Sequence, residues 1–161
     1  MLEAELAIEP VGYDDPDAVA LIDQVQQEYV VRYGGHDATH VATDEFTPPR
    51  GLFLVGYADG VPVACGGWRA HDAADPGFAD GDAEVKRMYV TPAARGRGFA
   101  RAILAELERT AARAGRRRIM LETGTRQPEA IALYESSGYR PVPNFGTYRC
   151  EPSSRCYGKE L

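Results

Sequence analysis

The sequence lacks long apolar runs. Although 44% of its 161 residues are hydrophobic, no stretch approaches the roughly 20 apolar residues that a membrane-spanning helix needs. We therefore expect no membrane partner. A charged content of 26% is ordinary for a globular protein, and the length is about that of one domain. Residues 1–161 are thus predicted to form a single domain around one core.

Cysteine and histidine are also scarce, and their positions match no metal or redox pattern. The three cysteines, Cys65, Cys150 and Cys156, form an odd set without a CxxC motif, which favours reduced, structural thiols. His36 and His40 lie close together, but a preceding Gly-Gly pair indicates a loop there. The sequence therefore predicts no metal site.

Secretory and nucleotide-binding signals are missing as well. Residues 1–5 are acidic and have neither the basic start nor the apolar centre of a secretory signal, so we expect the cytoplasm. The motifs GxGxxG, GxxxxGKS and GxxxxGKT are absent. The one glycine-rich turn follows several predicted strands instead of the first one, which excludes a Rossmann-type dinucleotide site.

Basic side chains are nearly absent from the first half of the chain. Residues 1–84 carry three arginines and seventeen carboxylates, whereas residues 85–118 carry ten basic and two acidic side chains. An acidic protein with one basic segment suits a small polyanion better than a long nucleic acid, so we expect no nucleic-acid partner. The alternative reading, a solvated helix face, is favoured for Arg109 and Arg113.

Hydrophobic periodicity and turn residues predict the order of the elements. Strands are expected at residues 6–11, 52–57, 61–69, 84–90, 118–123, 139–142 and 154–161, and helices at 16–33, 43–46, 99–114 and 127–135. A strand, a helix and a strand in succession predict a right-handed parallel crossover in the middle of the chain. The predicted fold class is α+β, with a mixed, mostly antiparallel sheet of about six to seven strands, a central parallel pair and about four flanking helices.

A glycine-rich turn precedes the predicted helix at residues 99–114. The first N–H groups of a helix have no partner inside it, and glycine lets a ligand approach the backbone closely. Such a helix start binds anions, and Arg95, Arg97 and Arg101 add positive charge around it. The turn therefore favours a phosphate or pyrophosphate ligand.

Three segments in this order resemble the GCN5-related N-acetyltransferases (GNAT). The family's pattern Gln/Arg-x-x-Gly-x-Gly/Ala is met by residues 95–100, Arg-Gly-Arg-Gly-Phe-Ala. Residues 84–90 resemble the family's fourth strand, and residues 130–139 resemble the helix and turn that follow its fifth strand. The likeness extends over roughly residues 50–161.

The resemblance implies that acetyl-coenzyme A (acetyl-CoA) binds between the fourth and fifth strands. Its pyrophosphate would lie on the N–H groups of Arg97, Gly98, Ala100 and Arg101, and its pantetheine would pair with backbone near the end of the fourth strand. The implied cofactor-binding residues are Met88, Tyr89, Val90, Arg95, Gly96, Arg97, Gly98, Phe99, Ala100 and Arg101.

Acetyl transfer to an amine needs a base, because an alkylammonium with a pKa near 10.4 leaves only about one molecule in a thousand nucleophilic at neutral pH. Glu84 matches the position where some family members carry a glutamate base. An ordinary glutamate is a weak base, so it would need desolvation or a relaying water. The alternative is that Glu84 only pairs with Lys86 or Arg87.

The departing thiolate needs a hydrogen-bond or proton donor. Tyr134 occupies the position of the family's tyrosine for that role, and a phenol pKa near 10 lies within about two units of a thiol pKa near 8.5. The alternative is a packing aromatic, since Tyr134 follows Ile131 and Leu133. Backbone N–H of the fourth strand, most simply that of Met88, would bind the oxyanion.

The resemblance predicts an acetyl-CoA-dependent N-acetyltransferase that acts on a small-molecule amine or amino-acid-like acceptor by direct attack in a ternary complex. The acidic first half would attract a cationic amine, whereas Arg32, Arg69 or Arg126 would hold an acceptor carboxylate. Tyr29, Tyr33, Trp68 and Tyr148 are candidate pocket walls, and the alternative for each of them is a place in the core. A protein lysine or N-terminal acetyltransferase, a noncatalytic acyl-CoA-binding sensor and a homodimer all stay open.

Overall fold

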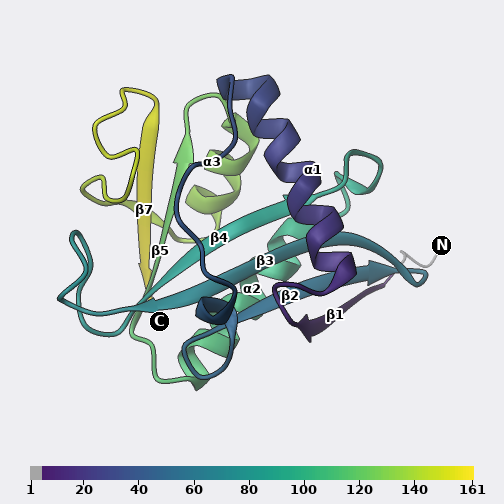
Figure 1. Ribbon diagram of the computed structural model, residues 1–161, viewed down its shortest axis with the longest axis horizontal. Helices are drawn as coiled ribbons and strands as arrows, with labels where there is room; N and C mark the ends of the chain where they lie inside the picture. Colours follow the sequence, from purple (N-terminus) through teal and green to yellow (C-terminus); the bar gives the residue numbers. More distant parts are fainter. Residues whose placement is uncertain (1–4) are drawn as a thin grey trace.

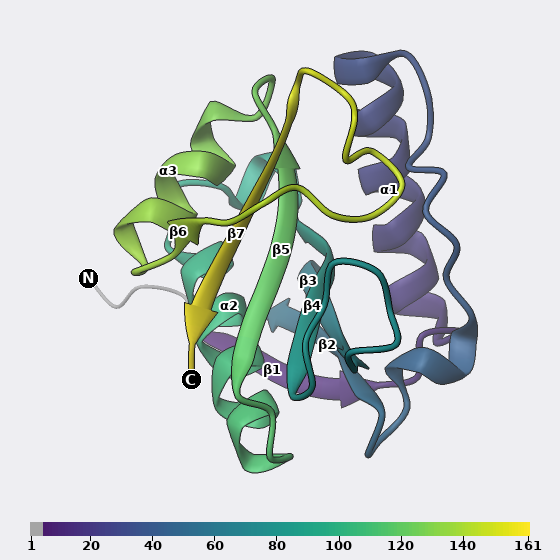
Figure 2. The ribbon, with the colours of Figure 1, turned by 90° about the vertical axis from the view of Figure 1, so that its left-hand side faces the viewer.

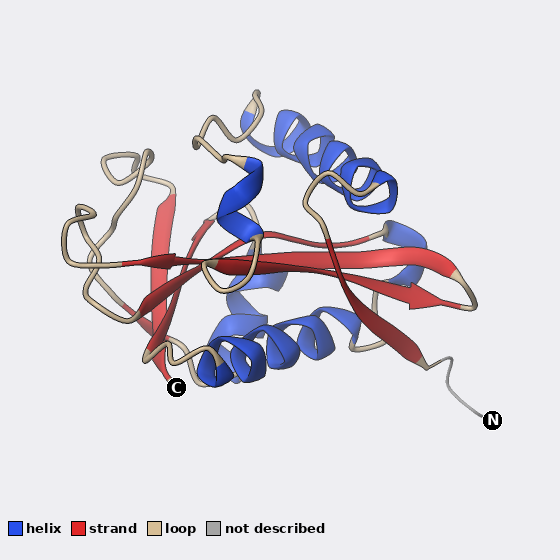
Figure 3. Cartoon of the chain, turned by 60° about the horizontal axis from the view of Figure 1, so that its bottom comes forward, coloured by secondary structure: helices blue, strands red, loops and turns tan. Residues whose placement is uncertain are grey.

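The computed structural model describes residues 5–161, which form one seven-stranded sheet with helices on both faces (Figures 1 and 3). The strands are β1 (Leu6–Val11), β2 (Gly51–Ala58), β3 (Val61–His71), β4 (Asp82–Val90), β5 (Arg118–Gly124), β6 (Arg140–Pro141) and β7 (Ser154–Glu160). The α-helices are α1 (Pro16–Tyr33), α2 (Phe99–Arg113) and α3 (Pro128–Ser136), and 3-10 helices cover Thr43–Phe46 and Pro92–Ala94. The fourth predicted helix is therefore the 3-10 turn at Thr43–Phe46.

The strand order is β1-β2-β3-β4-β5-β7-β6. Every neighbouring pair is antiparallel except β4 and β5, which α2 connects as a parallel crossover. The predicted fold class, a mixed and mostly antiparallel sheet with one central parallel pair, is confirmed. Figure 2 shows α1 on one side of β5 and α3 on the other.

Each face of the sheet has its own hydrophobic core. On one face α1 packs Leu21 and Val25 against a cluster that includes Phe46 and Phe53. On the other face α2 buries the apolar stripe that its sequence predicts, with Ile103, Leu104, Leu107 and Ala111 all at most 1% exposed. Helices on both faces explain why β2 and β4 are buried almost throughout, although β4 carries four charged residues.

The parallel pair β4–β5 is short, and this shortness creates the site. Register partners run only from Asp82 with Arg118 to Val85 with Leu121, after which the two strands separate. Beyond that point the β3–β4 ladder is irregular, and Arg87 adopts a positive φ of 61°. A bulge of this kind bends the strand and increases its twist, so the end of β4 is carried away from β5.

In residues 5–161 no helix is long and apolar enough to cross a bilayer. The expectation of a cytoplasmic location drew on the extreme amino terminus, and residues 1–4 of it lie outside the described part of the chain.

Two valines of α1 test whether this helix is held by its buried face. Val25 is 2% exposed and Val31 is 86% exposed, so valine-to-alanine changes at the two positions differ mainly in burial. We expect Val25→Ala to lower the free energy of unfolding by about 1.5–3 kcal/mol and Val31→Ala to change it by less than about 0.5 kcal/mol. Urea unfolding measures both; equal losses would contradict the assigned packing of α1.

Candidate active site

Where β4 and β5 separate, a cavity of about 490 Å³ opens between them. We call it the larger cavity. Its wall comes from the end of α1 and the following loop, from β4 and β5, from α3 and from the loop before β7, and it includes Tyr29, Asp37, Lys86, Arg87, Glu122 and Tyr134. Residues from five separate stretches of the chain therefore meet at this one opening of the sheet.

A smaller cavity of about 330 Å³ lies along the end of β4, the glycine turn and the first turn of α2. Nine of the ten residues that the sequence implies for the cofactor line it: Met88, Tyr89, Val90, Arg95, Gly96, Gly98, Phe99, Ala100 and Arg101. Arg97 does not line it; its guanidinium carbon lies 5.8 Å from the centroid of the Phe99 ring.

The two cavities share four lining residues, Met88, Gln127, Ala130 and Tyr134. Met88 comes from the bulged end of β4, and the other three come from α3 or the residue before it. Molecules that occupied both cavities at once would therefore meet beside Met88 and Tyr134.

The turn before α2 carries free hydrogen-bond donors. Gly96 and Gly98 have positive φ angles of 81° and 79°, and no side chain caps the helix. Within residues 5–161 no acceptor receives the N–H groups of Gly96, Arg97 and Gly98. A row of unpaired N–H groups at a helix start fits a pyrophosphate such as that of CoA.

The arginines around this turn have different partners. Arg95 donates from Nε to the Val90 carbonyl over 2.9 Å and forms a 2.7 Å ion pair with Glu28 of α1. Arg95 thus fixes the turn to β4 and α1, in addition to facing the smaller cavity. Arg101 donates to the hydroxyls of Ser136 and Ser137. Arg97 makes neither a hydrogen bond nor an ion pair with the described residues, and its charge is free for a ligand.

Tyr134 packs against other aromatic rings and also faces both cavities. Its ring packs near Tyr139 and Tyr157, with centroid distances of 5.9 and 6.4 Å. It is only 6% exposed, yet it lines both cavities. Burial raises the pKa of Tyr134 to about 12, so its phenol stays protonated at neutral pH.

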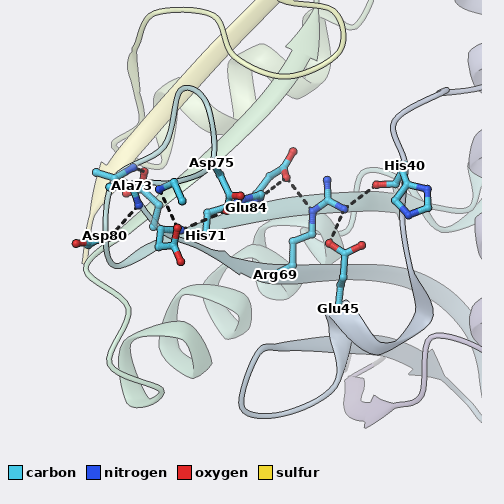
Figure 4. Close-up of polar contacts among 12 residues, drawn as sticks. His40, Glu45, Arg69, His71, Ala73, Asp75, Asp80 and Glu84 are labelled. Atoms are coloured by element: carbon cyan, nitrogen blue, oxygen red, sulfur yellow. Dashed lines mark hydrogen bonds and ion pairs between the residues drawn. The ribbon is translucent and has the colours of Figure 1, made fainter.

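Glu84 lies in a buried polar network that Figure 4 shows. Its Oε1 lies 2.9 Å from Arg69 Nε and 2.9 Å from His71 Nε2, and Arg69 also donates to Glu45 over 3.0 Å. Burial acts to raise the pKa of Glu84, but the hydrogen bond from His71 and the charges of Lys86 and Arg69 bring it below its ordinary value.

This environment favours a structural role for Glu84. It is 4% exposed and lines neither cavity. The alternative from the sequence was an ion pair of Glu84 with Lys86 or Arg87. Both of these residues pair with Asp37 instead, and Glu84 contacts Arg69 and His71. A catalytic role for Glu84 stays a prediction that its position and lowered pKa do not favour.

Glu122 is a carboxylate in the larger cavity that the sequence reasoning missed. It lies near the end of β5, and Ser154 Oγ donates to its Oε2 over 3.2 Å. Burial raises the pKa of Glu122, and the nearby charges of Asp37 and Glu84 act in the same direction against that of Lys86. The sequence did contain a signal for this residue: Glu122 is the one acidic residue in the mainly apolar stretch Ile-Met-Leu-Glu-Thr, and buried carboxylates are rare.

None of the three arginines suggested for an acceptor carboxylate lines the larger cavity. Arg69 is 6% exposed and engaged with Glu84 and Glu45. Arg32 pairs with Glu28 and Glu129, and Arg126 donates to the carbonyl of Arg32. These long side chains are committed to partners within the protein.

Of the four aromatic residues considered as pocket walls, Trp68 takes the alternative place in the core. It is 2% exposed in the core beneath α2, and its Nε1 donates to Thr110 Oγ1 over 3.1 Å. Tyr29, Tyr33 and Tyr148 do line the larger cavity. The Tyr148 hydroxyl also accepts a 2.6 Å hydrogen bond from the Ala38 N–H, which joins the loop before β7 to the loop after α1.

Comparisons with known proteins agree with this geometry. A model of the acetyltransferase (GNAT) family matches residues 19–139. A protein of Azospirillum brasilense named IAA acetyltransferase is 38% identical over 109 residues, which make up 68% of this chain and 67% of that protein.

Solved structures share the fold. A candidate acyl-CoA N-acyltransferase from Klebsiella pneumoniae has a TM-score of 0.79 at 28% identity over 99% of both chains. The PaiA N-acetyltransferase of Thermoplasma acidophilum, solved in complex with coenzyme A, has a TM-score of 0.71 at 14% identity over 98% of this chain and 99% of that chain.

Gly98 and Gly115 form a matched pair for testing the anion site. Both have a positive φ with open space where a Cβ would be, but Gly98 starts α2 and Gly115 follows its end. Alanine at either position should cost about 1–2 kcal/mol of stability. Only Gly98→Ala should also raise the dissociation constant of coenzyme A, by about tenfold or more, because the N–H cradle is disturbed. Calorimetric titration of the two variants decides; equal affinities would exclude this turn as the phosphate site.

Proposed function

The chain belongs to the GNAT family of acetyl-CoA-dependent N-acetyltransferases, and on that premise we propose that it acetylates the primary amine of a small-molecule acceptor by direct attack. The observation that carries the proposal is the pair of cavities that share Met88 and Tyr134. One cavity has the N–H donors that suit a pyrophosphate, and the other has a carboxylate that suits an amine. Direct attack requires both substrates to be bound together, and two adjoining cavities support this.

We assign the smaller cavity to acetyl-CoA. The unpaired N–H groups of the glycine turn and the free charge of Arg97 would hold its phosphates. Bound acetyl-CoA supplies an activated thioester, whose acetyl carbon bonds to the acceptor nitrogen as its bond to sulfur breaks. Met88 lies in the bulge, where the β3–β4 register skips it, which supports its N–H as a donor to the acetyl oxygen.

We assign the role of general base to Glu122. An alkylammonium holds its proton with a pKa near 10.4, and a carboxylate with a raised pKa accepts that proton more readily than an ordinary one. Ser154 donates to only one oxygen of Glu122, which leaves Oε1 for the amine proton. Glu84, whose pKa is lowered by its partners, is the weaker candidate.

Tyr134 is assigned to the departing sulfur. With a pKa of about 12 it keeps its proton at neutral pH and can donate a hydrogen bond. The difference between the pKa of Tyr134 and a thiol pKa near 8.5 is larger than it would be for an ordinary phenol, which makes proton transfer from Tyr134 to the sulfur less favourable. The assigned role is therefore hydrogen bonding to the developing thiolate, which leaves as the thiolate of coenzyme A and takes its proton from solvent.

The shape of the larger cavity favours a small acceptor over a protein chain. Its wall includes both the loop after α1 and the loop before β7, and the Tyr148–Ala38 hydrogen bond joins these loops across the sheet. A lysine on a folded protein would have to pass between them. A noncatalytic acyl-CoA sensor would have no use for the uncommitted oxygen of Glu122.

The activity test follows thiol release from acetyl-CoA while a panel of small primary amines is offered. We expect release that depends on the acceptor, with the acetylated amine identified by mass spectrometry. Acetyl-CoA binding without release for any amine would support a sensor instead. Acetylation of lysines in a cell lysate, in the absence of small-molecule turnover, would support a protein acetyltransferase.

The pH dependence of kcat/KM tests the base. Glu122 acts when deprotonated, so activity should fall as pH drops through its raised pKa, above the ordinary value of about 4.3. Glu122→Gln should remove this limb and lower kcat/KM by about 10²- to 10⁴-fold. Only the limb from the acceptor amine's own titration should then remain.

Glu84→Gln is the matched control. It should keep the acidic limb but lose about 3–5 kcal/mol of unfolding free energy, because Arg69 and His71 lose a buried partner. If the limb disappears in Glu84→Gln and persists in Glu122→Gln, the base is Glu84.

A further inference from the structure

The larger cavity contains two cations that share a single carboxylate. Lys86 Nζ lies 2.9 Å from Asp37 Oδ2, and Arg87 Nη1 lies 2.5 Å from the same oxygen. The other oxygen of Asp37 accepts the Thr39 N–H over 3.0 Å. Asp37 is fixed from α1 as well, because its N–H donates to Gln26 Oε1 over 2.8 Å.

The backbone of β4 brings these two cations together. In a regular strand, consecutive side chains point to opposite faces. Arg87 has a positive φ of 61° inside the bulge, and both Lys86 and Arg87 reach the same carboxylate. A positive φ at a bulky residue is strained and persists only where the surroundings impose it, typically at functional sites.

The pair has more donors than the protein uses. Arg87 Nε is buried, and no described residue accepts its hydrogen bond. Lys86 makes one hydrogen bond through a group with three donors, and it is only 9% exposed. The remaining acids on the cavity wall are Glu122 on β5 and the exposed Glu151 before β7. Behind β4, Glu84 is already engaged by Arg69 and His71.

We propose that the acceptor carries a carboxylate as well as its amine, and that Lys86 and Arg87 bind this carboxylate while the amine faces Glu122. The inference rests on the proposed function. The cavity wall presents cations at the Asp37 side and a carboxylate at the Ser154 side, which matches a zwitterion of the amino-acid class. An acceptor that is only a cation would leave the spare donors of Lys86 and Arg87 without a partner.

The rest of the wall suits an apolar or aromatic body. Tyr29, Tyr33 and Tyr148 contribute rings from α1 and from the loop before β7. Rings of this kind bind flat or aliphatic groups and leave orientation to the charged residues. The chemical class is therefore an amino acid or similar zwitterion with an apolar side chain.

The test compares phenylalanine and leucine with their α-amides, which replace only the carboxylate. Acetylation rates are measured at saturating acetyl-CoA for the wild type, Lys86→Met, Lys86→Arg and Lys159→Met. Lys159 is the chain's other lysine, paired with Glu108 away from both cavities. The amine pKa of an α-amide is lower than that of the amino acid, so more of the amide is nucleophilic at neutral pH. Intrinsic reactivity alone would therefore favour the amides, and a preference for the amino acids must come from binding.

In the wild type we expect kcat/KM for at least one amino acid to exceed that of its amide by about tenfold or more, as for loss of a charged hydrogen bond. Lys86→Met should abolish this preference, Lys86→Arg should retain part of it, and Lys159→Met should keep it. Equal or better use of the amides by the wild type would overturn the inference while leaving the acetyltransferase proposal intact. A preference that survives in Lys86→Met would overturn it too.

A binding measurement separates the two proposals. If neither kind of compound is acetylated, the same compounds are titrated calorimetrically into the protein with coenzyme A present. Tighter binding of an amino acid than of its amide, lost in Lys86→Met, would support the carboxylate site even though the proposed function failed. Equal or absent binding would overturn the carboxylate site as well.

Discussion

The separation of β4 from β5 after four paired residues is the constraint on which the rest of the structure depends. A parallel ladder that continued would satisfy the backbone of both strands and leave no opening in the sheet. Because the strands part after Val85 and Leu121, backbone and side chains of both become available to ligands. The two cavities, their shared residues Met88 and Tyr134, and the helix start beside them all follow from this one break.

The buried charged residues near this break form two groups with different contacts. On the paired part of β4, Oε1 of Glu84 lies within hydrogen-bond distance of both Arg69 and His71, which ties β4 to β3. On the separated part, Lys86 and Arg87 share one carboxylate, and Glu122 has an oxygen to spare. In the first group the cost of burying Glu84 is offset by its partners. In the second group some donors and acceptors stay unpaired, and our proposals assign these to the substrate.

Features that depend on a short stretch of residues could be predicted from the sequence. The apolar stripe of α2 and the glycine turn before it lie where the residues indicate, because periodicity and positive φ are properties of short segments. Pairings across the chain could not be predicted: Lys86 meets Asp37 across 49 positions, and Arg95 meets Glu28 across 67. Glu84 was named from the family resemblance and Glu122 was not considered, because a strand's sequence does not reveal which carboxylate an arginine on another strand engages.

The central claim is that donor and acceptor occupy adjoining cavities at the same time. Initial rates measured while acetyl-CoA and an accepted amine are both varied test this most directly. The two-cavity arrangement predicts double-reciprocal lines that intersect, because both substrates must be bound before the first product leaves. Parallel lines, together with a stable acetylated protein after acetyl-CoA alone, would contradict direct attack and require an acetylated residue of the chain as an intermediate.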